Sequence, residues 1–196
     1  TSIVAHVVRE VGGNRVAVEA LMGAGVDPHL YRASEGDVQR MSEADIVFYN
    51  GLHLEGRMVE IFERMAEQGA RTTALASSIE STRLMSPPAF EGAHDPHVWM
   101  DVAMWSDAVE SVRAALSELD PQHAADYQAR ATAYRERLTQ LDQYVREQVN
   151  RIPQQQRVLV TAHDAFNYFG RAYGVEVRGL QGISTVAEAG TADVQE

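Results

Sequence analysis

The chain has 196 residues, of which 45% are hydrophobic, so it is long and apolar enough for one large domain or two small ones with a proper core. Its net charge of -11 argues against binding to nucleic acid or to anionic membrane surfaces, because both need basic patches. Cysteine is absent, so any metal site must be built from nitrogen and oxygen ligands.

The first part of the chain alternates between helical and strand periodicity. In chain order, the apolar spacing predicts a helix over 3–11, a strand over 16–22, a helix over 34–41, a strand over 46–49, a helix over 58–65 and a strand over 72–75. Ser34 and Asp37 have the spacing of a capping box at a helix start. Strands that alternate with helices favour a parallel α/β unit, in which ligands bind in loops beyond the carboxyl ends of the strands.

The later part contains the longest predicted helix. The expected elements are a helix over 98–119, a helix of about 30 residues over 120–152, a strand over 157–161, a helix over 166–173 and a strand over 175–180. Asp120 is the expected cap of the long helix and Pro121 its first residue. A further helix is expected to begin near residue 185. No apolar run long enough to span a membrane and no signal peptide is present in this chain.

Three histidines stand in loops or at a strand end. Asp27-Pro28-His29 and Asp95-Pro96-His97 repeat one pattern, and Thr161-Ala162-His163 follows. A neutral imidazole is the commonest protein ligand for zinc, copper, nickel and iron. In both Asp-Pro-His sequences the proline stiffens the turn that carries the histidine. His29, His97 and His163 are therefore candidate metal ligands. His94 is expected to be a solvated loop residue, with an alternative ligand or a neighbour of the ligands as the other readings.

Four stretches carry a family resemblance. They are, in chain order, Val26 to His29, Glu43 to Gly51, Asp95 to Asp101 and Thr161 to Phe166. Together they resemble the extracytoplasmic zinc- and manganese-binding solute-binding proteins of bacterial ABC importers, and the match runs through nearly the whole chain.

The resemblance implies an α/β fold of two lobes with parallel sheets, joined by one long helix, with a single metal ion in the cleft between the lobes. His29 and His97 would come from the first lobe and His163 from the second. The expected division is an N-terminal α/β lobe over 1–119, a connecting helix over 120–152 and an incomplete C-terminal α/β lobe over 153–196.

The resemblance has departures as well. Family members carry a first strand before the first helix and a fourth ligand, an aspartate late in the second lobe, and this chain is expected to lack both. We therefore expect a truncated member of the family that works outside the cytoplasm, either in the periplasm or anchored by a lipid. We also expect that the chain self-associates or is disordered near its end. No carboxylate is assigned as a ligand.

Three imidazoles favour zinc, since manganese-preferring members of the family carry Glu at the position of His163. The loop over 86–93 has no histidine, unlike the His-rich loop of many zinc-specific relatives, so manganese stays open. The predicted function is capture of the ion and delivery to the membrane permease of an ABC importer, with no bond made or broken. The alternatives are a zinc hydrolase, with Asp164 or Glu188 as general base, and a protein of cell adhesion.

Overall fold

The computed structural model describes residues 1–88 and 92–181, and the chain divides into two compact units. The first unit comprises Thr1–Ile79 and Asp107–Glu136, and the second comprises Glu80–Ser106 and the chain from Arg137 onward. The chain passes between the units between Ile79 and Glu80, and again within the two longest described helices, α4 (Val102–Leu119) and α5 (Ala124–Asn150). The three-part division made from the sequence stays a prediction.

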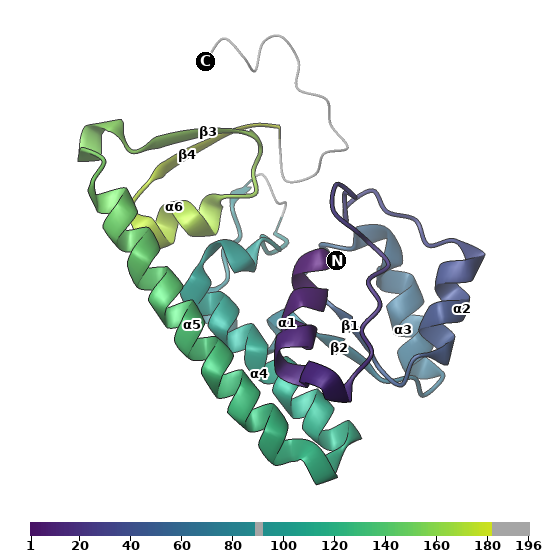
Figure 1. The fold of residues 1–196 in the computed structure, drawn as a ribbon. Coiled ribbons are helices and arrows are strands. Elements are labelled where there is room, and N and C mark those ends of the chain that lie inside the picture. The colour runs from purple at the N-terminus through teal and green to yellow at the C-terminus, as the bar shows by residue number, and fades with distance from the viewer. Residues whose placement is uncertain (89–91, 182–196) are drawn as a thin grey trace. The chain divides into compact units, whose positions relative to one another are not determined.

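The first unit is a small parallel α/β arrangement. Its remaining helices and strands are α1 (Ser2–Gly12), α2 (Glu35–Glu43), β1 (Val47–Tyr49), α3 (Val59–Glu67) and β2 (Thr72–Ala74). The two strands pair in parallel, with Val47 opposite Thr72. Helix α1 packs against β1 and α3 packs against β2, and Figure 1 shows α1 on one side of the strands and α2 and α3 on the other. In this unit the helices predicted over 3–11, 34–41 and 58–65 and the strands predicted over 46–49 and 72–75 are therefore confirmed.

Apolar residues at helical spacing fix how α1 packs. Val4, Val7, Val8 and Val11 share one face of the helix and are all buried. On the other side, a cluster of Met22, Met41, Met58 and Phe62 joins α2 and α3 to the sheet. Burial of these side chains holds the unit together, since each contributes about 1.5–3 kcal/mol.

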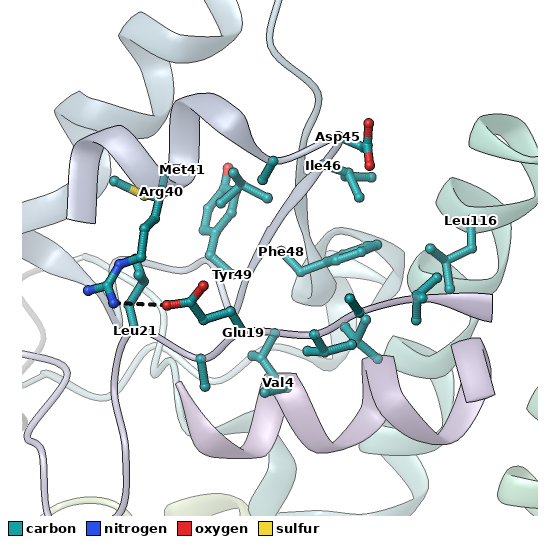
Figure 2. A pocket seen from close by; sticks show the side chains of 18 of the residues that line it. Val4, Glu19, Leu21, Arg40, Met41, Asp45, Ile46, Phe48, Tyr49 and Leu116 are labelled. Atoms are coloured by element: carbon teal, nitrogen blue, oxygen red, sulfur yellow. Dashed lines mark hydrogen bonds and ion pairs between the residues drawn. The ribbon is translucent and has the colours of Figure 1, made fainter. Parts of the chain in front are cut away.

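One predicted strand is absent from the described residues. Val16 has an extended backbone, but residues 16–22 are not paired with another strand and Leu21 and Met22 lie in a bend. These residues instead line, together with residues 43–49, a cavity of ≈ 800 Å³ in the first unit. Figure 2 shows Leu21, Ile46 and Phe48 among the lining side chains, with the Arg40–Glu19 ion pair beside them. No histidine is among the lining residues, so this cavity is separate from the candidate metal ligands.

The capping box of α2 is confirmed. The Asp37 carboxylate accepts hydrogen bonds from the Ser34 backbone N–H at 2.8 Å, from the Ser34 hydroxyl at 2.7 Å and from the Tyr31 hydroxyl at 2.8 Å. These bonds, led by that from the Ser34 backbone, hold the pKa of Asp37 well below its usual range. The cap also anchors the end of the loop that carries His29.

Replacing Asp37 by alanine is expected to lower the free energy of unfolding by about 1–2 kcal/mol at neutral pH. The folded-state pKa of Asp37 is depressed, so its contribution is present above the unfolded pKa of about 3.9 and declines as the pH falls below it. Urea unfolding of wild type and Asp37→Ala at pH 7 and at pH 3 measures the loss of stability at each pH. The control is Glu35→Ala, at an exposed site in the same helical turn. If the stability difference between Asp37→Ala and wild type grew as the pH fell, the depressed pKa assigned to Asp37 would be contradicted.

The second unit contains a second parallel pair of strands. It is built from β3 (Val158–His163), α6 (Asn167–Tyr173) and β4 (Glu176–Gln181), a β-α-β unit in which Val158 lies opposite Glu176. Helix α6 ends at Gly174, whose φ of 70° lies in the left-handed region that favours glycine. The α/β class with short parallel sheets and one long helix is thus confirmed, while the helix expected from residue 185 lies outside the described residues.

Short 3-10 turns occur between the main elements. They are η1 (Gly13–Arg15), η2 (Gly56–Met58), η3 (Leu75–Ser78), η4 (Ser81–Arg83), η6 (Val98–Met100), η7 (Pro121–His123) and η8 (Gln154–Gln156). Two of them correct the predicted helix starts, because α4 begins at Val102 and α5 at Ala124. The Asp120 side chain makes no capping bond and instead accepts from the Tyr127 hydroxyl at 2.8 Å. Within the part of the chain that the structure describes, no helix is long and apolar enough to cross a membrane.

Candidate metal centre

The repeated Asp-Pro-His sequence forms the same turn in both units. The backbone N–H of His29 donates to the Asp27 carboxylate at 2.9 Å, and that of His97 donates to the Asp95 carboxylate, also at 2.9 Å. An aspartate that accepts from the backbone two residues on closes an Asx turn, and the intervening proline fixes the backbone within it. The recurrence of the motif therefore has a structural meaning, since each copy presents a histidine from a stiff corner.

His97 is held more firmly than a surface histidine would be. Its side chain is 2% exposed and that of Asp95 is fully buried, and Nδ1 of His97 lies 2.8 Å from the Asp95 carboxylate. An ionised carboxylate only accepts hydrogen bonds, so the network assigns the ring hydrogen to Nδ1. Nε2 then carries the lone pair that a metal ion needs, which is the arrangement of a carboxylate–histidine–metal triad.

His163 reaches the same place from a strand. It is the last residue of β3, at the carboxyl end of the parallel pair, where ligands of α/β proteins usually bind. Its ring lies edge to face with that of His97, with 5.4 Å between the centroids and 76° between the planes. One ring nitrogen of each lies within 4.8 Å of the other, so a single ion could bind both after a small adjustment.

His29 belongs to the first unit and the His97–His163 pair to the second, whereas the resemblance implied that His97 would lie in the first lobe with His29. The structure therefore brings two of the three predicted ligands together within one unit. The role of His29 as the third ligand stays a prediction, supported by the turn that it shares with His97.

The carboxylates around the histidine pair add negative charge in a partly buried place. Burial raises the pKa of the Asp164 carboxyl above its usual range, and the nearby Asp95 carboxylate raises it further, whereas His163 and His97 oppose the shift. A bound cation would offset this crowding of negative charge. The surroundings of His97 and His163 thus suit a divalent ion better than an anion.

Asp164 occupies the space above Gly179 of β4. A Cβ atom built at Gly179 would lie 1.6 Å from Oδ1 of Asp164 and 2.7 Å from its Cγ. Gly179→Ala is expected to lower the free energy of unfolding by about 1–3 kcal/mol, because Asp164 must leave its position. Urea unfolding measures the loss against Gly23→Ala, where nothing lies within 4 Å. Equal stability of the two variants would show that Asp164 moves without cost.

The remaining histidines of interest have other partners. Nδ1 of His94 lies 2.8 Å from the Ser86 hydroxyl in an exposed contact, and Nδ1 of His123 lies 2.7 Å from the Asp120 carboxylate. Sequence reasoning missed Asn167 and Tyr168, which bind Asp95 from α6. No motif marks them, because their role depends on a contact across more than seventy residues.

The comparisons with known proteins agree with this chemistry. The ZnuA family, described as zinc-uptake complex component A, periplasmic, matches residues 1–196. The chain is 47% identical over 197 residues to the manganese-binding lipoprotein MntA of Bacillus subtilis, covering 100% of this chain and 63% of that protein. It is 45% identical over 195 residues to the zinc-binding protein TroA of Treponema pallidum, covering 99% and 62%.

A solved structure of the periplasmic zinc-binding protein TroA from Treponema pallidum superposes with a TM-score of 0.93 at 45% identity, covering 98% of this chain and 68% of that chain. The chain spans less than two thirds of the length of the two curated relatives. The family match over the whole sequence and the similarity to MntA and TroA lead to one conclusion. The chain belongs to the family of extracytoplasmic zinc- and manganese-binding solute-binding proteins of bacterial ABC importers.

Proposed function

We propose that the chain captures one divalent transition-metal ion through the imidazoles of His29, His97 and His163. The observation that carries the proposal is the His97–His163 pair, in which Asp95 fixes the tautomer of His97 and leaves the lone pair on Nε2. Two imidazoles from the second unit and one from the first would supply three nitrogen ligands. Capture is a binding event: the ion gains coordination bonds to the imidazoles, and no covalent bond is made or broken.

Zinc is the favoured ion and manganese the alternative. An all-imidazole ligand set suits zinc, and zinc stands above manganese in the general order of affinity for nitrogen and oxygen ligands. Relatives are named for both metals, a manganese-binding lipoprotein from Bacillus subtilis and a zinc-binding protein from Treponema pallidum. The ion that occupies the site would then depend both on affinity and on which metal the cell supplies.

Delivery to the permease of an ABC importer would complete the function. The family is described as a periplasmic component of a zinc-uptake complex, and one relative, SloC of Streptococcus mutans, is named a metal ABC transporter substrate-binding lipoprotein. Both descriptions support a protein that works outside the cytoplasm and passes its ion to a membrane complex. They favour transport over the zinc hydrolase alternative.

The test of the three-histidine assignment is the variant His29→Ala. Zinc affinity is expected to fall by at least about tenfold, because a three-nitrogen site becomes a two-nitrogen site. Competition with a chromophoric chelator measures the change, and His6→Ala, an exposed histidine of the same unit, is the control. If His29→Ala and His6→Ala both keep zinc affinity within about twofold of wild type, His29 is not a ligand.

A further inference from the structure

Helix α6 binds the turn that carries His97 at two points. The Asn167 side-chain amide donates to Oδ2 of Asp95 at 3.1 Å, and the Tyr168 hydroxyl donates to the Asp95 backbone carbonyl at 2.9 Å. Both partners are in the second unit, and Tyr168 and Asp95 are fully buried. One end of α6 therefore holds both the side chain and the backbone of Asp95.

The Tyr168 hydroxyl also ties this turn to a neighbouring segment. It accepts a hydrogen bond from the backbone N–H of Met85 at 3.0 Å, and the Met85 carbonyl accepts from the backbone N–H of Asp95 at 2.8 Å. Tyr168, Met85 and Asp95 thus form a closed ring of hydrogen bonds. The ring leaves the turn little freedom, because breaking a bond to the buried Tyr168 or Asp95 leaves a polar group away from water without its partner.

The bonds to the Asp95 carboxylate divide between its two oxygens. Oδ1 accepts from the backbone N–H and from Nδ1–H of His97, while Oδ2 accepts from Asn167. The bond from Asn167 fixes the rotation of the carboxylate and keeps Oδ1 directed at the imidazole. Without it, Oδ2 would be a buried acceptor that competes for the same ring hydrogen.

We propose that Asn167 and Tyr168 are positioning residues that fix the tautomer and orientation of His97 before metal arrives. The inference rests on the proposed function. Helix α6 begins four residues after His163, so one short segment carries the second ligand and clamps the first. The second unit therefore presents a preorganised pair of histidines to the ion.

The matched pair Tyr168→Phe and Tyr173→Phe tests the inference within one helix. Both hydroxyls are on buried tyrosines of α6, and each donates to one acceptor and accepts from one backbone N–H. Tyr173 donates to Asp142 and accepts from Val102, contacts that do not involve His97. Loss of a buried hydroxyl is thus common to both variants, whereas loss of the clamp on Asp95 is not.

Two measurements on the full chain decide the matter. The first is zinc affinity by chelator competition, in which Tyr168→Phe and Asn167→Leu are expected to bind about 10–100-fold more weakly than wild type and Tyr173→Phe to bind as wild type does. The second is the nitrogen-15 spectrum of the His97 ring in the metal-free chain. It is expected to show the single Nδ1–H tautomer in wild type and in Tyr173→Phe, and a mixture in the other two variants.

Equal zinc affinities in Tyr168→Phe, Asn167→Leu and Tyr173→Phe, together with an unchanged His97 tautomer, would overturn the positioning role. That result would leave the proposed function intact as long as His97→Ala still loses zinc. If wild type bound no zinc, the proposed function would fail on its own, and the tautomer measurement, which uses no metal, would still decide whether α6 fixes His97.

Discussion

Replacing His97 by alanine is expected to weaken zinc binding by more than about a hundredfold. Loss of a residue that merely orients a ligand already costs about 10–100-fold in affinity, so loss of the ligand itself should cost more. His97 is also the buried member of the three candidate ligands, and its ring lies against Asp95 and beside His163. Little compensation by neighbouring side chains is expected at so rigid a position.

The control for His97→Ala is His94→Ala. His94 lies three residues earlier in the same loop, and its ring contacts the Ser86 hydroxyl in an exposed position. Chelator competition should give wild-type zinc affinity for His94→Ala. Similar losses in the two variants would indicate that disturbance of the loop, and not loss of a ligand, explains the result.

Zinc is expected to raise the free energy of unfolding of the chain by about 4 kcal/mol when free zinc exceeds the dissociation constant a thousandfold. The ion binds the folded ligand set and has little affinity for the unfolded chain, where the histidines are far apart in sequence. For a chain of this length, such a gain corresponds to a rise in Tm of roughly 8–16 °C.

Thermal unfolding with zinc, and again after addition of EDTA, measures this linkage. The rise in Tm should vanish with the chelator. In His97→Ala, whose folded state lacks one of the proposed ligands, a hundredfold loss of affinity leaves at most about 1.4 kcal/mol of stabilisation at the same zinc concentration, so the rise in Tm should be much smaller. A rise of the same size in His97→Ala would locate the stabilising ion elsewhere on this acidic protein.

Local signals predicted much of the fold. The apolar spacing of Val4, Val7 and Val11 and the glycines that follow predicted α1, and Ser34 with Asp37 predicted the start of α2. These features depend on residues within one or two helical turns of each other, so the sequence alone contains the physical cause. The order of helices and strands followed from the same kind of signal.

Features that depend on distant residues were predicted less well. Residues 16–22 have strand periodicity, yet a strand also needs a hydrogen-bonded neighbour, and β1 pairs with β2 while a cavity adjoins residues 16–22. Asp120 has the composition of a helix cap, but the Tyr127 hydroxyl and the ring of His123 occupy its carboxylate. These partners lie three and seven residues from Asp120, so this error came from a choice between local side-chain contacts and not from a distant residue.

The residues of the candidate site also differ in how well the sequence predicted them. The Asp-Pro-His motif and the resemblance to the importer family identified His29, His97 and His163, and the structure adds the pairing of His97 with His163. Asn167 and Tyr168 could not be found from sequence, since their importance comes from contacts with Asp95 made by folding. The candidate ligands were thus predicted from the sequence, whereas the proposed positioning residues were not.

The most direct test of the central proposal is X-ray absorption spectroscopy at the zinc edge on the one-to-one zinc complex of the chain. Three imidazoles in the first coordination shell, at the zinc–nitrogen distance of about 2.0–2.1 Å, are the expected result. The imidazole count should fall to two in His29→Ala, in His97→Ala and in His163→Ala. A shell built mainly from carboxylate or water oxygens in the wild-type chain would contradict the three-histidine site.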